Sequence, residues 1–187
     1  MLEERIRAEG KLMPGNIVKV DGFLNHRVDV ALLRALAREF KAHFKDRRPT
    51  LIMTVEASGI PLATVCAEEF GVPLLFAKKA KSDNIEGGLL TSEIMSYTYN
   101  KKVKLIVSGE WLSAKDRVLI IDDFMARGEA MRGLKKIIAQ AGAELVGIGI
   151  AIEKGYQGGG DGLRAEGIDC YSLAIIEESC GESIRFR

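Results

Sequence analysis

The segment that most constrains the fold is an unbroken run of strand-forming apolar residues at positions 118–121. A run without alternating polar residues is typical of a strand that is buried on both faces of a parallel sheet. Asp122 and Asp123 follow it directly. Because side chains alternate along a strand, both carboxylates can serve one ligand only where the chain leaves the sheet. We therefore expect a turn at these acids.

A loop and a helix are predicted after the acidic pair. Gly128 supplies backbone freedom for the loop, and apolar residues then recur at helical spacing between positions 131 and 138. The loop amides and the start of the helix would form an anion site, while the carboxylates suit hydroxyl groups or a hydrated magnesium ion. A sugar phosphate would satisfy both. The simpler alternative is that the acids only end a strand and Asp123 caps the helix.

A second strand, loop and helix are predicted within residues 51–71. The loop contains the small residues Ser58 and Gly59, which let backbone amides approach an anion closely. A tight turn without a ligand is the alternative. A third strand candidate, residues 72–77, leads into Lys78, Lys79 and Lys81. These ammonium groups would either concentrate positive potential beside the loop or simply be solvated.

The rest of the chain continues the alternation of helices and strands. Helices are indicated at residues 2–10 and, after an N-cap at Asp29, up to residue 45. Residues 82–88 have the composition of a mobile lid, above a predicted hairpin of residues 91–99 and 102–107 with Trp111 packed at its base. Further strand candidates are residues 17–20, 145–152 (with glycines that allow close packing), 171–176 and 183–186. Residues 158–162 are expected to form a glycine-rich loop before a short helix at 163–167.

This order of elements predicts a doubly wound α/β fold, with a mostly parallel central sheet and a small hood. Lys154 comes two residues after the strand predicted at 145–152, with Glu153 between them. A lysine just outside the carboxyl end of a buried parallel strand lies where open sheets of this kind bind ligands. The alternative is that Lys154 pairs with Glu153 and has no other role.

Length and composition narrow the class of protein. With 187 residues, 47% of them hydrophobic, the chain suits one ordinary core, so we expect a single domain over residues 1–187. Its 27 Lys and Arg against 26 Asp and Glu do not indicate a binder of nucleic acid or of membrane surfaces. The three cysteines show no paired metal-ligand spacing, and no apolar run approaches the length of a membrane helix. We expect a cytoplasmic protein.

Two segments carry a resemblance to a known family. VLIIDDFMARGEA resembles the phosphoribosyl diphosphate (PRPP) motif of type I phosphoribosyltransferases, and KVDGFLNHRVD is similar to a hood segment of bacterial xanthine phosphoribosyltransferases. The similarity extends through nearly the whole chain. It departs from the family pattern at Arg127-Gly128-Glu129-Ala130, where the more usual loop has Thr-Gly-Gly-Thr. The resemblance implies the type I phosphoribosyltransferase fold, a hood formed mainly by residues 1–28 and the C-terminal segment, a mobile lid hairpin, and a homodimer.

The resemblance also implies roles for particular residues. Asp122 and Asp123 would hold the ribose hydroxyls. The 5-phosphate would be held by Ala126, Arg127, Gly128, Glu129 and Ala130. The diphosphate would be bound by Ser58, Gly59, Lys78, Lys79 and Lys81, and the base by Val18, Asn25 and Lys154. No side chain is assigned as a resident metal ligand, since Mg²⁺ would arrive with PRPP.

These roles imply a purine-salvage enzyme. It would transfer phosphoribose from PRPP to xanthine, releasing diphosphate and forming xanthosine 5'-monophosphate. Two alternatives remain open. One is a phosphoribosyltransferase for another purine, namely guanine, hypoxanthine or adenine. The other is a non-catalytic regulator that senses PRPP.

Overall fold

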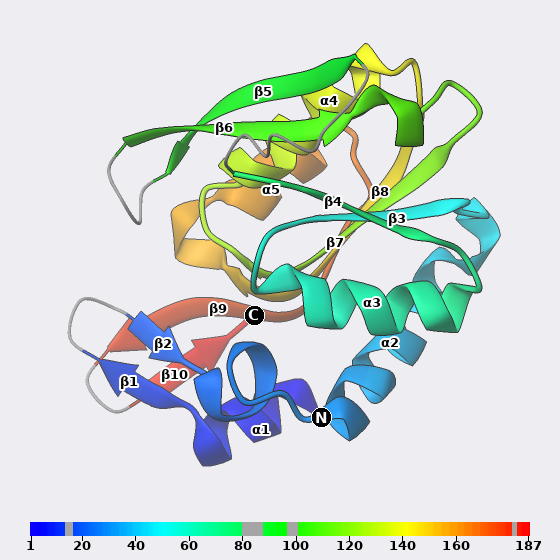
Figure 1. Ribbon diagram of the computed structural model, residues 1–187. Coiled ribbons are helices and arrows are strands. Elements are labelled where there is room, and N and C mark those ends of the chain that lie inside the picture. The colour runs from blue at the N-terminus through cyan, green and yellow to red at the C-terminus, as the bar shows by residue number, and fades with distance from the viewer. Residues whose placement is uncertain (14–16, 80–87, 97–100, 181–182) are drawn as a thin grey trace.

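A six-stranded sheet forms the centre of the computed structural model, which describes residues 1–13, 17–79, 88–96, 101–180 and 183–187 (Figure 1). The strands lie in the order β10-β9-β8-β7-β3-β4, and all neighbours are parallel except β10 against β9. Their bounds are β3 Leu51–Val55, β4 Leu74–Ala77, β7 Arg117–Met125, β8 Glu144–Lys154, β9 Cys170–Cys180 and β10 Ser183–Phe186. The predicted α/β fold with a mostly parallel sheet is confirmed.

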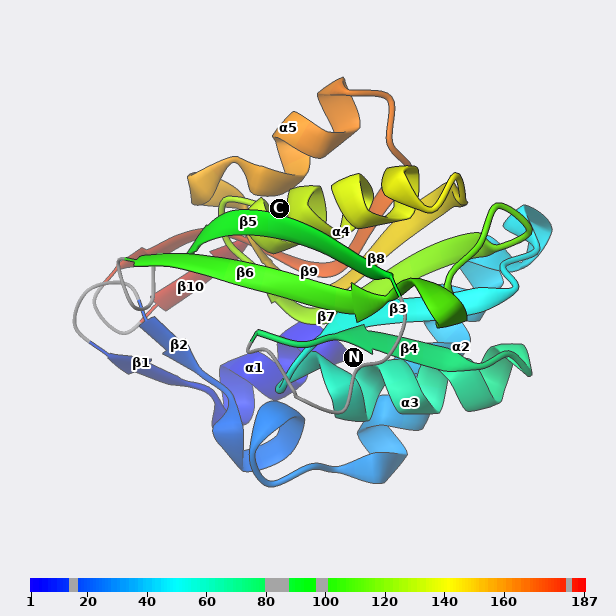
Figure 2. The same ribbon diagram turned by 45° about the horizontal axis from the view of Figure 1, so that its top comes forward.

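Helices cover both faces of this sheet (Figures 1 and 2). They are α2 Val30–Phe44 and α3 Gly59–Phe70 on one face, and α4 Glu129–Gln140 and α5 Gly159–Ala165 on the other. The side chains of β7 alternate between the two cores: Leu119 and Ile121 pack with α2 and α3, whereas Val118 and Ile120 pack with α4. This double burial explains why the strand has no polar alternation in the sequence.

The N-terminal segment packs beside the last two strands. It contains helix α1 Leu2–Glu9, the short strands β1 Lys11–Met13 and β2 Ile17–Lys19, and a π-helical turn, Asp21–Asn25. Arg7 of α1 donates from Nη1 to the carbonyl of Ile184 at 2.8 Å, and its guanidinium lies 4.7 Å from the centre of the Phe186 ring. The two ends of the chain therefore build one side of the molecule together, as Figure 1 shows.

A separate antiparallel pair, β5 Leu89–Ser96 and β6 Lys101–Ser108, lies against α4. Gly133 of α4 makes this close approach possible, because a Cβ there would lie 2.5 Å from Ile94 Cγ2 and 2.9 Å from Leu105 Cδ1. The hairpin prediction is confirmed. Residues 82–87 of the predicted lid, together with Lys81, lie outside the described residues. The expected packing of Trp111 at the hairpin base is wrong, since that residue is 65% exposed.

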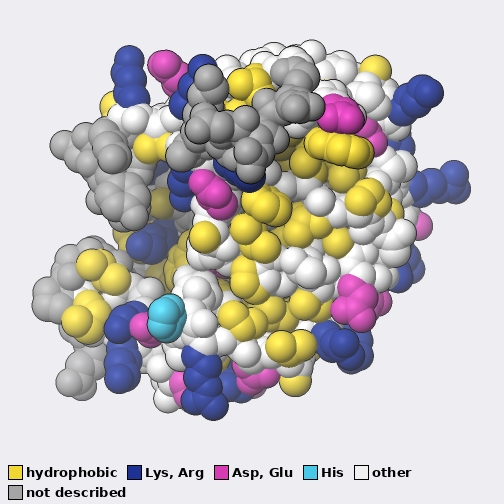
Figure 3. All heavy atoms as spheres, in the orientation of Figure 1, with side chains coloured by type: hydrophobic (Ala, Val, Ile, Leu, Met, Phe, Trp, Pro, Cys, Tyr) yellow, Lys and Arg dark blue, Asp and Glu magenta, His cyan; other side chains and the backbone are white. Residues whose placement is uncertain are grey.

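Figure 3 shows the face over α3 and β4 as far as the described residues form it. Hydrophobic side chains gather across the middle of this face, and Lys and Arg side chains lie mainly toward its edges (Figure 3). Within the part of the chain that the structure describes, no helix is long and apolar enough to span a membrane.

The glycines of β8 allow close packing, as the sequence predicts. A Cβ at Gly149 would lie 2.7 Å from Ile121 Cδ1 and 2.8 Å from Phe40 Cδ1, so α2 can approach the sheet only where a side chain is missing. The packing of α2 and its N-cap, Asp29, which accepts from Leu32 N–H at 3.1 Å, together fix how this helix meets the strands.

We predict that Gly149→Ala destabilises the protein by about 1–3 kcal/mol, because a methyl group has no room between α2 and β7. The free energy of unfolding in urea measures this loss. Gly22→Ala is the control, since a Cβ at Gly22 meets nothing within 4 Å. Equal stability of the two variants would contradict the packing argument.

Candidate active site

The acidic pair lies inside strand β7. Asp122 pairs in register with Ile150 of β8, and the pairing continues to Met125 opposite Glu153. The turn expected at the acids is therefore wrong, because β8 continues to pair with β7 beyond them. Strand β3 pairs with β7 only as far as Ile120, so space opens beside the acids on that side. Both carboxylates line one cavity despite the continuous strand.

This cavity has a volume of about 250 Å³ and lies at the carboxyl ends of the parallel strands. The lining includes Ser58, Lys79, Asp122, Asp123, Ala126, Arg127, Gly128, Glu129 and Ala130, all of which the sequence had proposed as site residues. It also includes side chains that sequence reasoning missed, among them Glu56, Phe124, Ile94, Met95 and Val103. The last three belong to the hairpin, which the sequence analysis placed beneath a lid without assigning any of its residues to the site.

Asp123 joins three separate parts of the chain. Its carboxylate accepts from Asn25 Nδ2 at 2.9 Å and from Ser58 Oγ at 3.0 Å, and the residue is only 2% exposed. Asn25 comes from the N-terminal π-helical turn, and Ser58 from the loop after β3. The alternative that Asp123 caps the following helix is wrong, because α4 begins at Glu129 with Gly128 at the N-cap.

Asp122 is buried beside Asp123 and accepts from the Asp123 N–H at 3.0 Å. Burial, and then the negative charge of Asp123, raise the pKa of Asp122 well above its usual range, while Lys79 acts in the opposite direction. Gly59 leaves room for this carboxyl group, since a Cβ there would lie 2.2 Å from Asp122 Oδ1. Gly59 therefore packs against the Asp122 carboxyl group, and it is not among the described residues that line the cavity.

The loop after the acids presents backbone groups to the cavity. Gly128 has φ +78°, a left-handed conformation that favours glycine, and α4 starts immediately after it. The first N–H groups of a helix have no partner within the helix, and its dipole favours negative charge at this end. The loop and the start of the helix therefore form an anion site in the same cavity as the two carboxylates.

The loop after β3 and the end of β4 form the opposite wall. The peptide bond between Glu56 and Ala57 is cis, and Glu56 Oε1 accepts from the backbone N–H of Lys79 at 2.5 Å. Lys78 makes backbone hydrogen bonds with Ile106 of β6 and does not line the described cavity. Of the three predicted lysines, the structure thus brings Lys79 to the cavity.

The residues proposed to bind the base lie around the same end of the sheet. Lys154 is the last residue of β8 and is partly buried, and burial lowers its pKa. Its suggested pairing with Glu153 is wrong, because Glu153 pairs with Arg164. Val18, in strand β2 of the N-terminal segment, is buried in the core. Neither Val18 nor Lys154 is among the described residues that line the cavity.

The acids also suit a magnesium ion that arrives with a substrate. Among the described residues, no three His, Cys, Asp or Glu side chains form a cluster that could hold a metal by itself. Asp122 and Asp123 nevertheless offer oxygen ligands at the cavity, and Mg²⁺ commonly binds through one or two carboxylates, waters and substrate phosphates. The donor set fits an ion carried by a phosphorylated ligand.

Comparison with known proteins identifies the family. The family described as "Phosphoribosyl transferase domain" matches residues 20–161. The chain belongs to the phosphoribosyltransferase family. Its fold also matches a structure described as "APRTase from Giardia lamblia Complexed with 9-deazaadenine", with a TM-score of 0.80 and 24% identity, covering 96% of this chain and 99% of the other.

Within this family, the chain is similar over its whole length to curated xanthine phosphoribosyltransferases. A xanthine phosphoribosyltransferase of Bifidobacterium longum (strain NCC 2705) is 51% identical over 189 residues, covering 100% of this chain and 98% of the relative. Another, from Alkaliphilus metalliredigens (strain QYMF), is 46% identical over 187 residues, covering 100% and 93%.

We predict that Asp122→Asn stabilises the ligand-free protein increasingly as the pH rises from about 5 to about 8. The folded state binds the Asp122 proton more tightly than the unfolded chain does, because the pKa is raised on folding. The free energy of unfolding of the wild type therefore falls as the pH rises above about 4, the ordinary carboxyl pKa, because Asp122 must then give up its proton in the unfolded chain before it does in the folded one. Asparagine does not titrate, so the variant does not lose this stability. Calorimetric Tm values without divalent cations test this. A Tm difference that stays constant with pH would contradict it.

Proposed function

We propose that this chain transfers phosphoribose from PRPP to xanthine, releasing diphosphate and forming xanthosine 5'-monophosphate. The observation that carries the proposal is the pair of buried carboxylates opening into one cavity with an anion-binding loop. A sugar that bears hydroxyl groups and a phosphate matches this combination. The identity of about half of all residues with curated xanthine phosphoribosyltransferases supports the choice of base.

The sugar phosphate occupies the centre of the proposed site. Asp122 and Asp123 accept hydrogen bonds from the ribose hydroxyls, and Asn25 and Ser58 keep Asp123 in place for this role. The backbone of residues 126–130 and the start of α4 hold the 5-phosphate. This loop has Arg127 and Glu129 and lacks the hydroxyl side chains of the usual motif. Its contacts with the phosphate therefore come mainly from backbone amides.

The diphosphate lies toward the loop after β3. Ser58, the Ser58–Gly59 peptide and Lys79, which lines the cavity, stabilise the charge that builds up as this group departs. Lys78, which lies outside the described lining, and Lys81 add positive potential. Mg²⁺ carried by PRPP would be held by the diphosphate oxygens and by the Asp122 and Asp123 carboxylates, directly or through water, and would supply further charge neutralisation.

The base binds at the end of β8, against the N-terminal segment. Lys154 donates to an exocyclic oxygen of the purine, which favours an oxopurine over adenine. Asn25 and Val18 complete this side. A bond forms from the base nitrogen to the anomeric carbon while the bond from that carbon to the diphosphate breaks, through an oxocarbenium-like transition state, and the proton displaced from the base passes to the departing diphosphate. Most of the rate gain then comes from orientation and electrostatics, and no residue has to act as a strong general base.

The same proposal covers the organisation of the enzyme. Residues 1–187 act as one phosphoribosyltransferase domain, with a hood formed by residues 1–28 and the C-terminal strands. The enzyme works in cytoplasmic purine salvage as a homodimer.

The proposal is tested by measuring diphosphate release from PRPP and Mg²⁺ with each nucleobase in turn. We expect xanthine to give the highest kcat/KM, followed by the other oxopurines. Turnover of adenine above xanthine would overturn the assignment of the base. PRPP binding without turnover of any base would favour a non-catalytic regulator instead.

We predict that Asp123→Asn lowers kcat/KM about 100-fold with little effect on folding. The variant keeps the shape of the side chain and can still pair with Asn25 and Ser58, but it loses the charge that orients the ribose hydroxyls. Steady-state kinetics and a thermal melt measure the two effects separately. Unchanged activity would remove Asp123 from the sugar site.

We predict that Lys154→Met raises the KM for xanthine about tenfold to a hundredfold and changes the KM for PRPP much less. The loss corresponds to one hydrogen bond from a charged donor, worth about 1.5–3 kcal/mol. Initial rates with each substrate varied in turn give the two constants. A rise confined to the KM for PRPP would place Lys154 at the sugar phosphate instead of the base.

A further inference from the structure

Helix α5 begins at Gly159, directly after its N-cap Gly158, although the sequence predicts a loop over residues 158–162. The helix lies directly against the loop after the acids. A Cβ at Gly159 would be 2.3 Å from the carbonyl oxygen of Ala126 and 2.7 Å from the backbone nitrogen of Gly128. Only glycine fits this contact without moving the backbone of the loop.

Arg132 of α4 makes a second connection between the same loop and α5. Its Nη1 donates to the carbonyl of Arg127 at 2.8 Å, and its Nε lies 3.4 Å from Oε1 of Glu166, the residue after α5. Glu166 also pairs with Lys135 at 2.7 Å, one turn further along α4. Arg132 and Lys135 therefore share one acidic partner, but the described contact to the loop belongs to Arg132.

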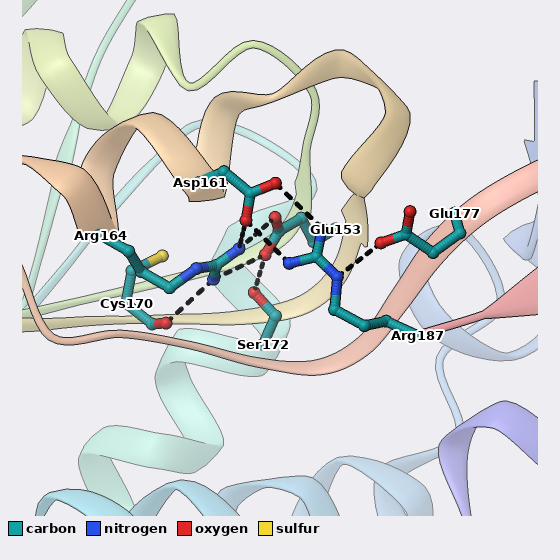
Figure 4. Close-up of polar contacts among 7 residues, drawn as sticks. All are labelled: Glu153, Asp161, Arg164, Cys170, Ser172, Glu177 and Arg187. Atoms are coloured by element: carbon teal, nitrogen blue, oxygen red, sulfur yellow. Dashed lines mark hydrogen bonds and ion pairs between the residues drawn. The ribbon is translucent and has the colours of Figure 1, made fainter.

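Helix α5 is itself fixed to the sheet by an ion pair between Arg164, whose side chain is 30% exposed, and the fully buried Glu153. Arg164 donates from Nη2 to Glu153 Oε1 at 2.7 Å and from Nη1 to Oε2 at 3.1 Å, and Glu153 is 0% exposed (Figure 4). Ser172 Oγ donates to the same carboxylate at 2.5 Å. A Cβ at Gly160 would lie 2.1 Å from Glu153 Oε1, so the helix backbone sits on this group.

The outer side of α5 is tied to the last residue of the chain. Arg187 donates to both oxygens of Asp161, at 2.7 and 2.9 Å, and to Glu177 of β9 at 2.5 Å (Figure 4). Removing one partner of the ion pair between Glu153 and Arg164 is costly, because it leaves an uncompensated charge. Helix α5 is thus held rigidly against β8 and β9, and it can serve as a fixed support.

The contacts to α5 and Arg132 set which way the loop peptides point. In a trans peptide, the C=O and N–H groups point in opposite directions. The carbonyl of Arg127 is directed to Arg132, so the N–H of Gly128 points away from it. The carbonyl of Ala126 lies against Gly159, so the N–H of Arg127 points away from α5. The orientation of two adjacent peptides is thereby fixed in a loop whose residues line the cavity.

We propose that Arg132 and Gly159 are positioning residues for the sugar phosphate: they hold the carbonyls of residues 126–127 outward, so that the loop amides converge on the 5-phosphate. This inference rests on the proposed function, because it takes that loop as the phosphate site. It explains why a glycine run follows the strand that carries Lys154.

The test is calorimetric titration of PRPP with Mg²⁺ into the full-length protein, comparing wild type, Arg132→Gln and Lys135→Gln. Loss of one hydrogen bond that orients the loop predicts a Kd for PRPP about three- to tenfold higher in Arg132→Gln. The Kd should stay within about twofold in Lys135→Gln, which loses its ion pair to Glu166 but no described contact to the loop. The KM for xanthine should be unchanged in both.

Equal Kd values in Arg132→Gln and Lys135→Gln would overturn the inference and leave the proposed function intact. Absence of PRPP binding by the wild type would instead overturn the proposed function, and this inference with it. If Arg132→Gln does not fold, Gly159→Ala decides the question by the same titration. A raised Kd for PRPP supports the positioning role, and an unchanged Kd contradicts it.

Discussion

The hydrogen bonds to the Asp123 carboxylate hold the site together. A buried carboxylate needs donors, and here they come from Asn25 of the N-terminal segment and Ser58 of the loop after β3. One side chain of the central strand therefore fixes two surface segments that lie far from it in sequence. The N-terminal segment, the loop after β3 and the acidic pair take their relative positions from these two contacts.

The second constraint is that strand β7, at the position of the acids, forms a ladder with only one of its two neighbours. Strand β8 continues beside β7 past the acids, whereas β3 stops pairing at Ile120. The cavity opens where the pairing of β7 with β3 ends, at the carboxyl ends of the parallel strands, which is where ligands bind in folds of this type. Helix α5 then supports the far side of the loop, and its own position depends on the ion pair of Glu153 and Arg164.

Most of the fold could be predicted from the sequence because burial leaves a direct record there. Strands β3 and β7 appear as unbroken apolar runs, and the buried face of α4 appears as apolar residues at helical spacing. The PRPP-like loop could be found by its glycine and its acids. Three features depend on tertiary contacts and could not be found: β7 continues through the acids because β8 pairs with them, Trp111 lies exposed, and helix α5 begins at Gly159, where its first residues pack on the loop and on Glu153.

The central claim is that Asp122, Asp123 and the loop of residues 126–130 hold one phosphorylated sugar. A crystal structure of the protein with PRPP and Mg²⁺, in the absence of a base, tests it most directly. The account predicts ribose hydroxyls within hydrogen-bonding distance of the two carboxylates, and the 5-phosphate against the loop amides. PRPP bound elsewhere, or a sugar turned away from both acids, would contradict it.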